Sequence, residues 1–279
     1  MSFYIHPSCK IHPTARINVV EGYLDKDAVV NEHAVLEGYR IEIGREAFID
    51  RFATIGGGSC FDRSAFLIAG HWFHMGVNSH VNTARGVTVG NEVGIGIDSK
   101  IFTHGAYIDC YGLGAPVQWE GVSIGNNVWL PNAWVNPSVQ IGSNVVVAAR
   151  SLISADIPSG SLAAGTPAKV IKADAYPRRL TDEERLTLLV AIVGQLKTRL
   201  ADNGVNCAVN YNYYEGKIDL IADDGDTVFY LLEKIIVGTA SKAAIVVKDQ
   251  LRRNGIRFRF EISNGEWKKW SSGSCTAQQ

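Results

Sequence analysis

Histidines are the side chains of this protein best suited to proton chemistry near neutral pH, and two segments hold the informative ones. His104 lies in KIFTHGAY, directly before a segment rich in glycine and aromatic residues. His71, His80 and Asn82 lie in an earlier segment, AGHWFHMGVNSHVNTARG. An imidazole has an ordinary pKa of about 6.5, so it can accept a proton, hold a polar ligand or bind a metal. These residues are therefore candidates for a general base, a small-molecule site or a metal site.

The elements that must hold these side chains are indicated by an apolar residue at about every sixth position. The repeat positions are Leu24, Val30, Leu36, Ile43, Ile49, Ile55, Phe61, Leu67, Val89, Ile95, Ile101, Tyr107, Ile124, Leu130, Ile141, Val147 and Ile153. A period of six fits neither an amphipathic helix nor an alternating strand, but it is typical of hexapeptide solenoids. We expect three repeats per triangular coil, with these side chains pointing inward and the coils stacked about 4.8 Å apart.

The repeat divides the chain into a solenoid and a C-terminal part. We expect a mainly β domain over residues 1–173, with loops at 69–86 and 108–121 where the repeat is interrupted. Solenoid loops commonly carry binding groups. A connecting helix is predicted over 174–203, because Thr181 and Glu184 form a capping-box pattern before an apolar stripe. Strand patterns, a second helix and alternating apolar residues around Phe258 predict a small α+β domain over 204–279.

Composition and charge argue against several classes of function. The chain has 279 residues, a formal net charge of −1 and a pI of about 6.7, so we expect no nucleic-acid partner. It shows no secretory signal and no apolar stretch of about 18 residues, so we expect no membrane span. Its five cysteines contain no CxxC pair, which favours reduced thiols and a cytoplasmic location over a disulfide framework.

The stretch from Val122 to Lys172 carries a resemblance to a known family. Its sequence, VSIGNNVWLPNAWVNPSVQIGSNVVVAARSLISADIPSGSLAAGTPAKVIK, resembles the end of the hexapeptide-repeat acyltransferases. It is most similar to the branch of galactoside, maltose, xenobiotic and polysaccharide acetyltransferases. The resemblance implies a left-handed parallel β-helix, a homotrimer with active sites between neighbouring subunits, and acyl-coenzyme A as the co-substrate. The C-terminal domain lies outside the resemblance.

Residue roles carry over from this resemblance. His104 precedes Trp129 by 25 residues, close to the family spacing between the catalytic histidine and a tryptophan, so His104 is the expected general base. Coenzyme A is expected along the outside of the later coils, on Trp129, Ala148, Ala149, Gly165, Thr166, Lys169 and Lys172. The tryptophan would flank the pantetheine arm, the alanines would offer backbone groups, and the lysines would meet the phosphates.

The acceptor is expected to contact His71, His80, Asn82 and Trp119. By resemblance it is a hydroxyl or amine of a sugar, with a nucleotide-linked sugar or a surface-polysaccharide precursor as the expected class. Two alternatives stay open: a zinc enzyme similar to gamma-class carbonic anhydrases, and a non-catalytic binding solenoid. The carbonic anhydrases pair two histidines about five residues apart. Here the steps between successive histidines, His71, His74, His80 and His104, are 3, 6 and 24 residues. We therefore assign no metal ligand.

Overall fold

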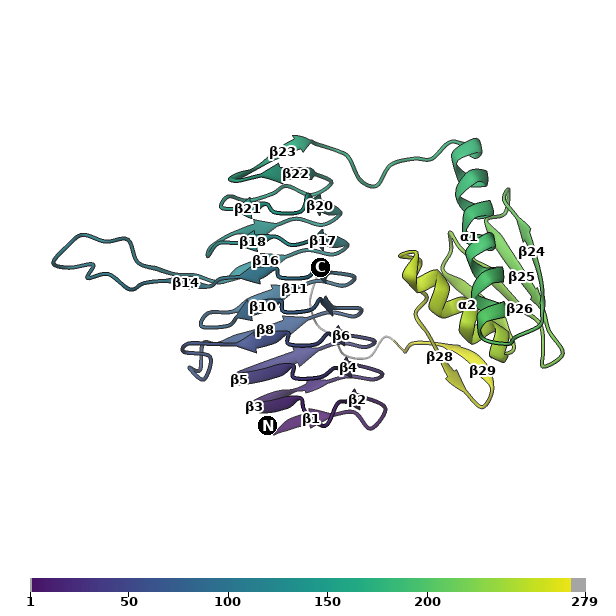
Figure 1. The fold of residues 1–279 in the computed structure, drawn as a ribbon, viewed down its shortest axis with the longest axis horizontal. Helices are drawn as coiled ribbons and strands as arrows, with labels where there is room; N and C mark the ends of the chain where they lie inside the picture. Colours follow the sequence, from purple (N-terminus) through teal and green to yellow (C-terminus); the bar gives the residue numbers. More distant parts are fainter. Residues whose placement is uncertain (1, 272–279) are drawn as a thin grey trace. The chain divides into compact units, whose positions relative to one another are not determined.

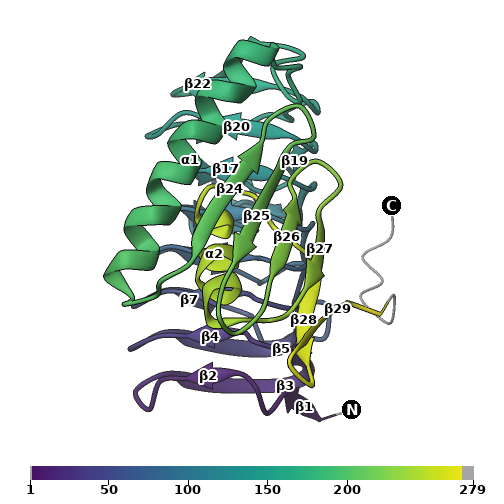
Figure 2. The same ribbon diagram turned by 90° about the vertical axis from the view of Figure 1, so that its right-hand side faces the viewer.

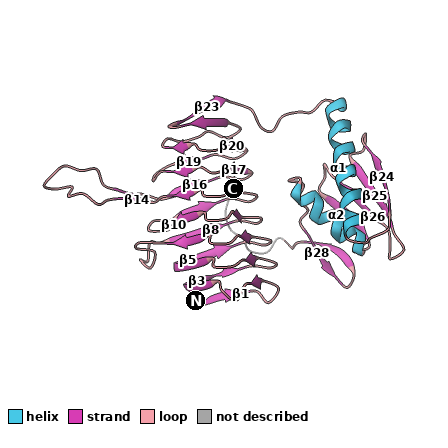
Figure 3. Cartoon of the chain, viewed as in Figure 1, coloured by secondary structure: helices cyan, strands magenta, loops and turns pink. Residues whose placement is uncertain are grey.

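The computed structural model describes residues 2–271, and it divides them into two compact units. The boundary falls between Arg178 and Arg179. Figure 1 traces the first unit as a stack of short strands, and Figure 3 shows both labelled helices in the second unit. No helix within residues 2–271 is long and apolar enough to cross a membrane. The end of the predicted C-terminal domain, residues 272–279, lies outside the described residues.

Short strands, nearly all parallel, form two large sheets in the first unit. The twelve-stranded sheet contains β1 (Phe3–Ile5), β3 (Arg16–Leu24), β5 (Val35–Ile43), β7 (Thr54–Gly56), β8 (Phe66–Ala69), β10 (His80–Asn82), β11 (Val87–Val89), β13 (Lys100–Ile101), β16 (Val122–Ile124), β18 (Trp134–Val135), β19 (Gln140–Ile141) and β21 (Leu152–Ile153). The nine-stranded sheet contains β2 (Lys10–Ile11), β4 (Val29–Val30), β6 (Phe48–Ile49), β9 (His74–Met75), β12 (Gly94–Ile95), β17 (Val128–Leu130), β20 (Val145–Val147), β22 (Leu162–Gly165) and β23 (Ala168–Lys172).

The core of this unit consists of three internal columns of apolar side chains. In-register pairing places each repeat position on the equivalent position of the next coil. The first column is Leu36, Ile55, Val81, Ile101, Val135 and Ile153. The second is Val30, Ile49, Met75, Ile95 and Leu130. The third is Leu24, Ile43, Ala69, Val89, Ile124 and Ile141. All of these side chains are buried, which confirms the mainly β, left-handed β-helix class predicted from the repeat.

Residues 69–86, which the sequence predicts as a loop, continue the solenoid instead. They include β9 and β10, and the side chains of Phe73, Met75 and Val81 are fully buried. The prediction is wrong here because a coil needs apolar side chains only at its inward positions, while polar and aromatic ones face outward. Two predicted repeat positions are also wrong. Phe61 is half exposed and Tyr107 fully exposed, because both lie in segments that leave the coil.

Two segments leave the coil at the same corner, on levels of the stack that are separated by the level of β10. The first, residues 57–65, connects β7 to β8. The second leaves after Thr103, and its two ends pair antiparallel as β14 (His104–Gly105) and β15 (Gln118–Trp119). Figure 1 shows this second segment projecting from the stack as a long loop. We call the corner formed by residues 57–65, 82–86 and 103–121 the His104 corner.

The second unit is a four-stranded antiparallel sheet with two helices and a small hairpin. Its elements are α1 (Asp182–Asp202), β24 (Ala208–Asn212), β25 (Lys217–Ile221), β26 (Thr227–Tyr230), β27 (Ile235–Gly238), α2 (Lys242–Arg253), β28 (Phe260–Ser263) and β29 (Glu266–Lys269). The predicted capping box of Thr181 and Glu184 is present at the start of α1. The apolar stripe of α1 is buried in one core with α2 and the sheet. Figure 2 shows the strands of this sheet, β24 to β27, facing the viewer. The helix predicted as a connector therefore belongs to the core of this unit.

Candidate active site

The imidazole of His104 is held by an amide from the neighbouring coil. His104 Nδ1 lies 3.0 Å from Asn82 Oδ1. The backbone N–H of Ala84, which can only donate, also lies 3.2 Å from Asn82 Oδ1, so this atom is an acceptor. His104 Nδ1 must then carry the hydrogen, and Nε2 keeps its lone pair. The arrangement selects the tautomer that can accept a proton at Nε2.

Asn82 itself is fixed by further contacts behind His104. Its side chain is only 4% exposed, and the Thr103 hydroxyl oxygen lies 2.6 Å from its Oδ1. Gly57 leaves room for it, since a Cβ at that position would lie 2.8 Å from Asn82 Nδ2. Asn82 is predicted from the sequence to contact the acceptor. In the structure its side-chain oxygen lies against His104, where it orients the imidazole.

Trp119 covers one face of the His104 ring. The two residues are directly paired across β14 and β15, and their rings stack with centroids 5.0 Å apart and planes 19° from parallel. The Arg85 guanidinium carbon lies 4.9 Å from the Trp119 ring centroid, and Arg85 Nη1 donates to the Ala84 carbonyl at 2.7 Å. Residue type alone did not mark Arg85 or Thr103, because both reach this corner only through contacts between coils.

His80 lies beside this group, whereas His71 does not. His80 pairs in register with Thr54 and Lys100 on the outer surface of the stack. Its ring lies 3.6 Å from the position of a Cβ on Gly57, the same glycine that Asn82 approaches. Burial, and then the positive charge of Lys100, lower the pKa of His80. A neutral imidazole at this position can donate or accept a hydrogen bond to a polar ligand.

His71 has a structural role at a different corner of the coil. Its ring Nδ1 accepts a hydrogen bond from the backbone N–H of Arg45 at 3.0 Å, and the backbone N–H of His71 donates to Asn91 Oδ1 at 2.9 Å. These bonds connect successive turns of the stack, so the acceptor nitrogen of the ring is already used in holding the fold together. The structure therefore does not bring His71 to the His104 corner, contrary to its expected place among the acceptor contacts.

The residues expected to bind coenzyme A follow the nine-stranded sheet and the turns after its strands. Trp129 is outward on β17 and about half exposed, and its ring lies over Gly94, where a Cβ would be only 2.5 Å from Cε3. Lys169 and Lys172 are exposed on β23. We call the surface formed by Trp129, Ala148, Ala149, Gly165, Thr166, Lys169 and Lys172 the Trp129 face.

Backbone bonding within the Trp129 face limits what it can offer a ligand. The Ala148 N–H donates to the Ala163 carbonyl at 2.8 Å, and the Ala148 carbonyl accepts the Ser151 hydroxyl at 2.7 Å. The Gly165 N–H is taken by the Ser151 hydroxyl at 3.1 Å, and the Thr166 hydroxyl donates to the Arg150 carbonyl at 3.1 Å. The Ala148 N–H is therefore already bonded within the stack, whereas Ala149 is small and exposed at the turn.

The Trp129 face and the His104 corner lie on different parts of the solenoid. Trp129 belongs to the nine-stranded sheet, whereas Asn82 ends a strand of the twelve-stranded sheet and His104 follows another. One chain thus holds the expected base at one corner and the expected cofactor surface on another face. Within residues 2–271, no three His, Cys, Asp or Glu side chains are grouped so that they could hold a metal ion.

Comparison with known proteins identifies the family. No protein-family model matches the chain. Galactoside O-acetyltransferase from Escherichia coli K12 is 31% identical over 138 residues, which cover 46% of this chain and 68% of that protein. A putative lipopolysaccharide biosynthesis O-acetyl transferase, WbbJ, from the same organism is 32% identical over 117 residues, 37% of this chain and 59% of the relative. A solved galactoside acetyltransferase in complex with coenzyme A shares 25% identity, with a TM-score of 0.38 over 47% of this chain and 64% of that one.

The chain therefore belongs to the hexapeptide-repeat acyltransferases, as the resemblance of the Val122–Lys172 stretch predicts. Within this family it falls in the branch that holds galactoside O-acetyltransferase. The matched lengths leave a large part of the chain unmatched in each of these comparisons.

Proposed function

We propose that the protein transfers an acyl group, acetyl in the simplest case, from coenzyme A to a hydroxyl or amine of a sugar. The expected acceptors are a nucleotide-linked sugar or a surface-polysaccharide precursor. Membership of the acyltransferase family supports the reaction class. The observation that carries the proposal is the 3.0 Å contact between His104 Nδ1 and Asn82 Oδ1, because it leaves Nε2 of a neutral imidazole ready to accept a proton.

In this mechanism His104 acts as the general base. Nε2 removes the proton of the acceptor hydroxyl or amine while the acceptor atom forms a bond to the thioester carbonyl carbon. As the carbon–sulfur bond breaks, the imidazolium returns the proton to the departing thiolate. Asn82 accepts the Nδ1 hydrogen throughout, which keeps the ring in one orientation and stabilises the imidazolium while it exists. Trp119 covers one face of the ring, so the acceptor approaches the exposed edge.

We propose that the complete site forms between two copies of the chain in a homotrimer. The His104 corner and the Trp129 face lie on different faces of one solenoid, so a base from one copy would act on coenzyme A held along the face of its neighbour. The family resemblance supports the trimer. Light scattering after gel filtration should give about three times the 30.4 kDa chain mass. A monomer with full acyl-transfer activity would exclude a shared site.

We also propose how the chain is organised and where it works. Residues 1–173 would be the catalytic domain, and α1 would form part of a separate C-terminal domain, since it shares the core of that unit. The cysteines of the described part, Cys9, Cys60, Cys110 and Cys207, are free thiols. Free thiols suit a reducing compartment, which supports a cytoplasmic location.

Binding of coenzyme A is the direct test of this function. Titration calorimetry on the full chain should show binding of acetyl-coenzyme A, and a panel of sugars and nucleotide sugars should be screened for acceptor-dependent thiol release. Addition of zinc or of a chelator should leave both readouts unchanged. Binding that needs zinc would favour the alternative zinc enzyme, and a chain that binds no coenzyme A would contradict the proposed reaction.

A further inference from the structure

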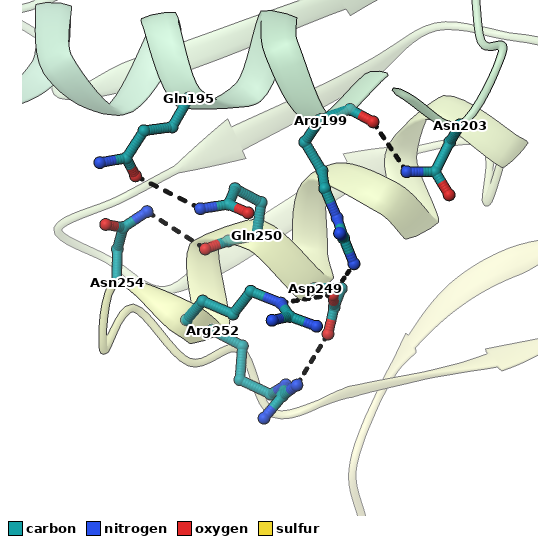
Figure 4. Close-up of polar contacts among 8 residues, drawn as sticks. Gln195, Arg199, Asn203, Asp249, Gln250, Arg252 and Asn254 are labelled. Atoms are coloured by element: carbon teal, nitrogen blue, oxygen red, sulfur yellow. Dashed lines mark hydrogen bonds and ion pairs between the residues drawn. The ribbon is translucent and has the colours of Figure 1, made fainter. Parts of the chain in front are cut away.

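Three arginines of the second unit surround one carboxylate, Asp249 of α2. Arg252 Nη2 lies 2.8 Å from Asp249 Oδ1, whereas Arg253 Nε and Arg199 Nη2 lie 3.0 and 3.4 Å from Oδ2. Figure 4 shows Arg199 reaching Asp249 from α1 while Arg252 reaches it from α2. Three guanidinium groups and one carboxylate leave this arginine cluster with an excess of two positive charges.

Local structure explains only part of this arrangement. Arg252 and Arg253 lie in the last turn of α2, where positive charge interacts favourably with the free carbonyls of the helix end. Burial raises the pKa of Asp249, but hydrogen bonds from Arg252 and Arg253 outweigh it and hold the pKa below its ordinary value. One arginine would already neutralise the carboxylate. Neither effect calls for a third guanidinium from the other helix.

The guanidinium groups keep most of their donors available. Each of the three arginines uses one nitrogen on Asp249, whereas a guanidinium carries five N–H groups. The side chains of Arg199, Arg252 and Arg253 are 37%, 41% and 52% exposed. Next to them, Gln250 Nε2 donates to Gln195 Oε1 at 3.3 Å and links the same two helices. The cluster is therefore open to solvent while its position is fixed by both helices.

We propose that this arginine cluster binds a phosphate group. A phosphate monoester carries about −1.5 to −2 charges at neutral pH and three acceptor oxygens, which match the excess charge and the unused donors of the cluster. A carboxylate has one charge and two oxygens, which a single arginine satisfies. The ligand class is thus a phosphate ester or diphosphate, either free in solution or in a lipid headgroup. The site does not rest on the proposed acyl transfer, and it assigns a role to a unit outside the motif-bearing solenoid.

Calorimetry on the full chain tests the site, with inorganic phosphate and pyrophosphate as probes at an ionic strength of about 0.15 M. The double variant Arg252→Gln/Arg253→Gln should bind pyrophosphate at least about tenfold more weakly, because it loses charge-assisted hydrogen bonds. Lys197→Gln/Lys268→Gln is the matched control, since it removes two exposed positive charges elsewhere in the same unit. Circular dichroism and melting temperatures verify that each variant is folded.

Two further arms separate the possible sources and mechanisms of binding. Co-sedimentation is measured with phosphatidylcholine vesicles that contain or lack phosphatidic acid. Binding only to the vesicles that contain phosphatidic acid assigns the site to a lipid headgroup. Binding only of the free probes assigns it to a soluble ligand. Arg252→Lys/Arg253→Lys keeps the charge but loses the planar fork, and it should also bind more weakly. The proposal is overturned if no probe binds the wild type, if the control pair weakens binding equally, or if the lysine variant binds as tightly as the wild type.

Discussion

The His104 corner and the Trp129 face, the two regions we assign to acyl transfer, are built by different means. At the His104 corner the chain leaves the coil twice, and side chains hold one another: His104 binds Asn82, which also binds Thr103. On the Trp129 face the chain follows the repeat, and bonds between coils, such as that from the Ala148 N–H to the Ala163 carbonyl, use the polar groups of the backbone. The corner therefore depends on particular polar groups, whereas the face depends on small residues that leave room beside a regular backbone.

The largest expected effect comes from removing the base at the corner. His104→Ala should lower kcat by roughly 10² to 10⁴, the usual effect of losing a general base, while coenzyme A affinity stays unchanged because the Trp129 face is intact. Steady-state kinetics and calorimetry measure the two quantities. His12→Ala, at an exposed histidine in the first coils, is the control. Comparable loss in both variants would show that His104 has no special role.

A carboxylate in place of the Asn82 amide should change the pH dependence of the same step. Asn82→Asp places a negative charge beside the imidazole, which favours its protonated form and raises its pKa. The acidic limb of the kcat profile should move to higher pH by about one unit, and kcat at neutral pH should fall. Asn132→Asp, at a turn where Asn132 Nδ2 bonds the Ile97 carbonyl at 3.2 Å, is the matched control. An unchanged acidic limb would show that the group at position 82 does not influence the proposed base.

The Trp129 face should respond in affinity rather than in rate. Gly94→Ala places a Cβ about 2.5 Å from Trp129 Cε3, so the ring must move from its present position. Coenzyme A affinity should fall by about three- to tenfold, in line with the energy of one aromatic contact, with little change in kcat at saturation. Gly58→Ala is the control, because a Cβ there meets no atom within 4 Å. Unchanged affinity would remove Trp129 from the cofactor surface.

The smallest effect concerns stability at the edge of the His104 corner. The pKa of His80 is lowered in the folded protein, so the unfolded chain, with an ordinary value of about 6.5, takes up the proton more readily. Stability from the neutral ring is therefore present above about pH 6.5 and is lost as the pH falls toward the lowered value. The melting temperature of the wild type should drop more between about pH 7 and about pH 5 than that of His80→Gln. Parallel curves would contradict this linkage.

Much of the solenoid is predictable from sequence, because inward positions such as Ile55, Ile95 and Ile141 demand apolar side chains at a fixed period. Phe61 and Tyr107 match that period by chance, since residue type does not reveal where the chain leaves the coil. The candidate base is recognised from the family spacing to Trp129. The part played by Asn82 could not be predicted, because its contacts to Thr103 and His104 bridge 21 and 22 residues between coils and depend on exact stacking register.

The place where the β14–β15 segment leaves the stack has a consequence for how this scaffold can diversify. The Glu120 N–H bonds the Thr103 carbonyl at 3.1 Å, and β16 pairs directly with β11, so the coil closes beneath the excursion as though it were absent. Residues 106–117 can therefore be lengthened, shortened or grafted from another chain without shifting the register of any column. Because His104 is the first residue of the excursion, each exchange would place a new surface beside the base that we propose. On that proposal, the scaffold lets substrate choice change without changes to the proposed catalytic and cofactor surfaces.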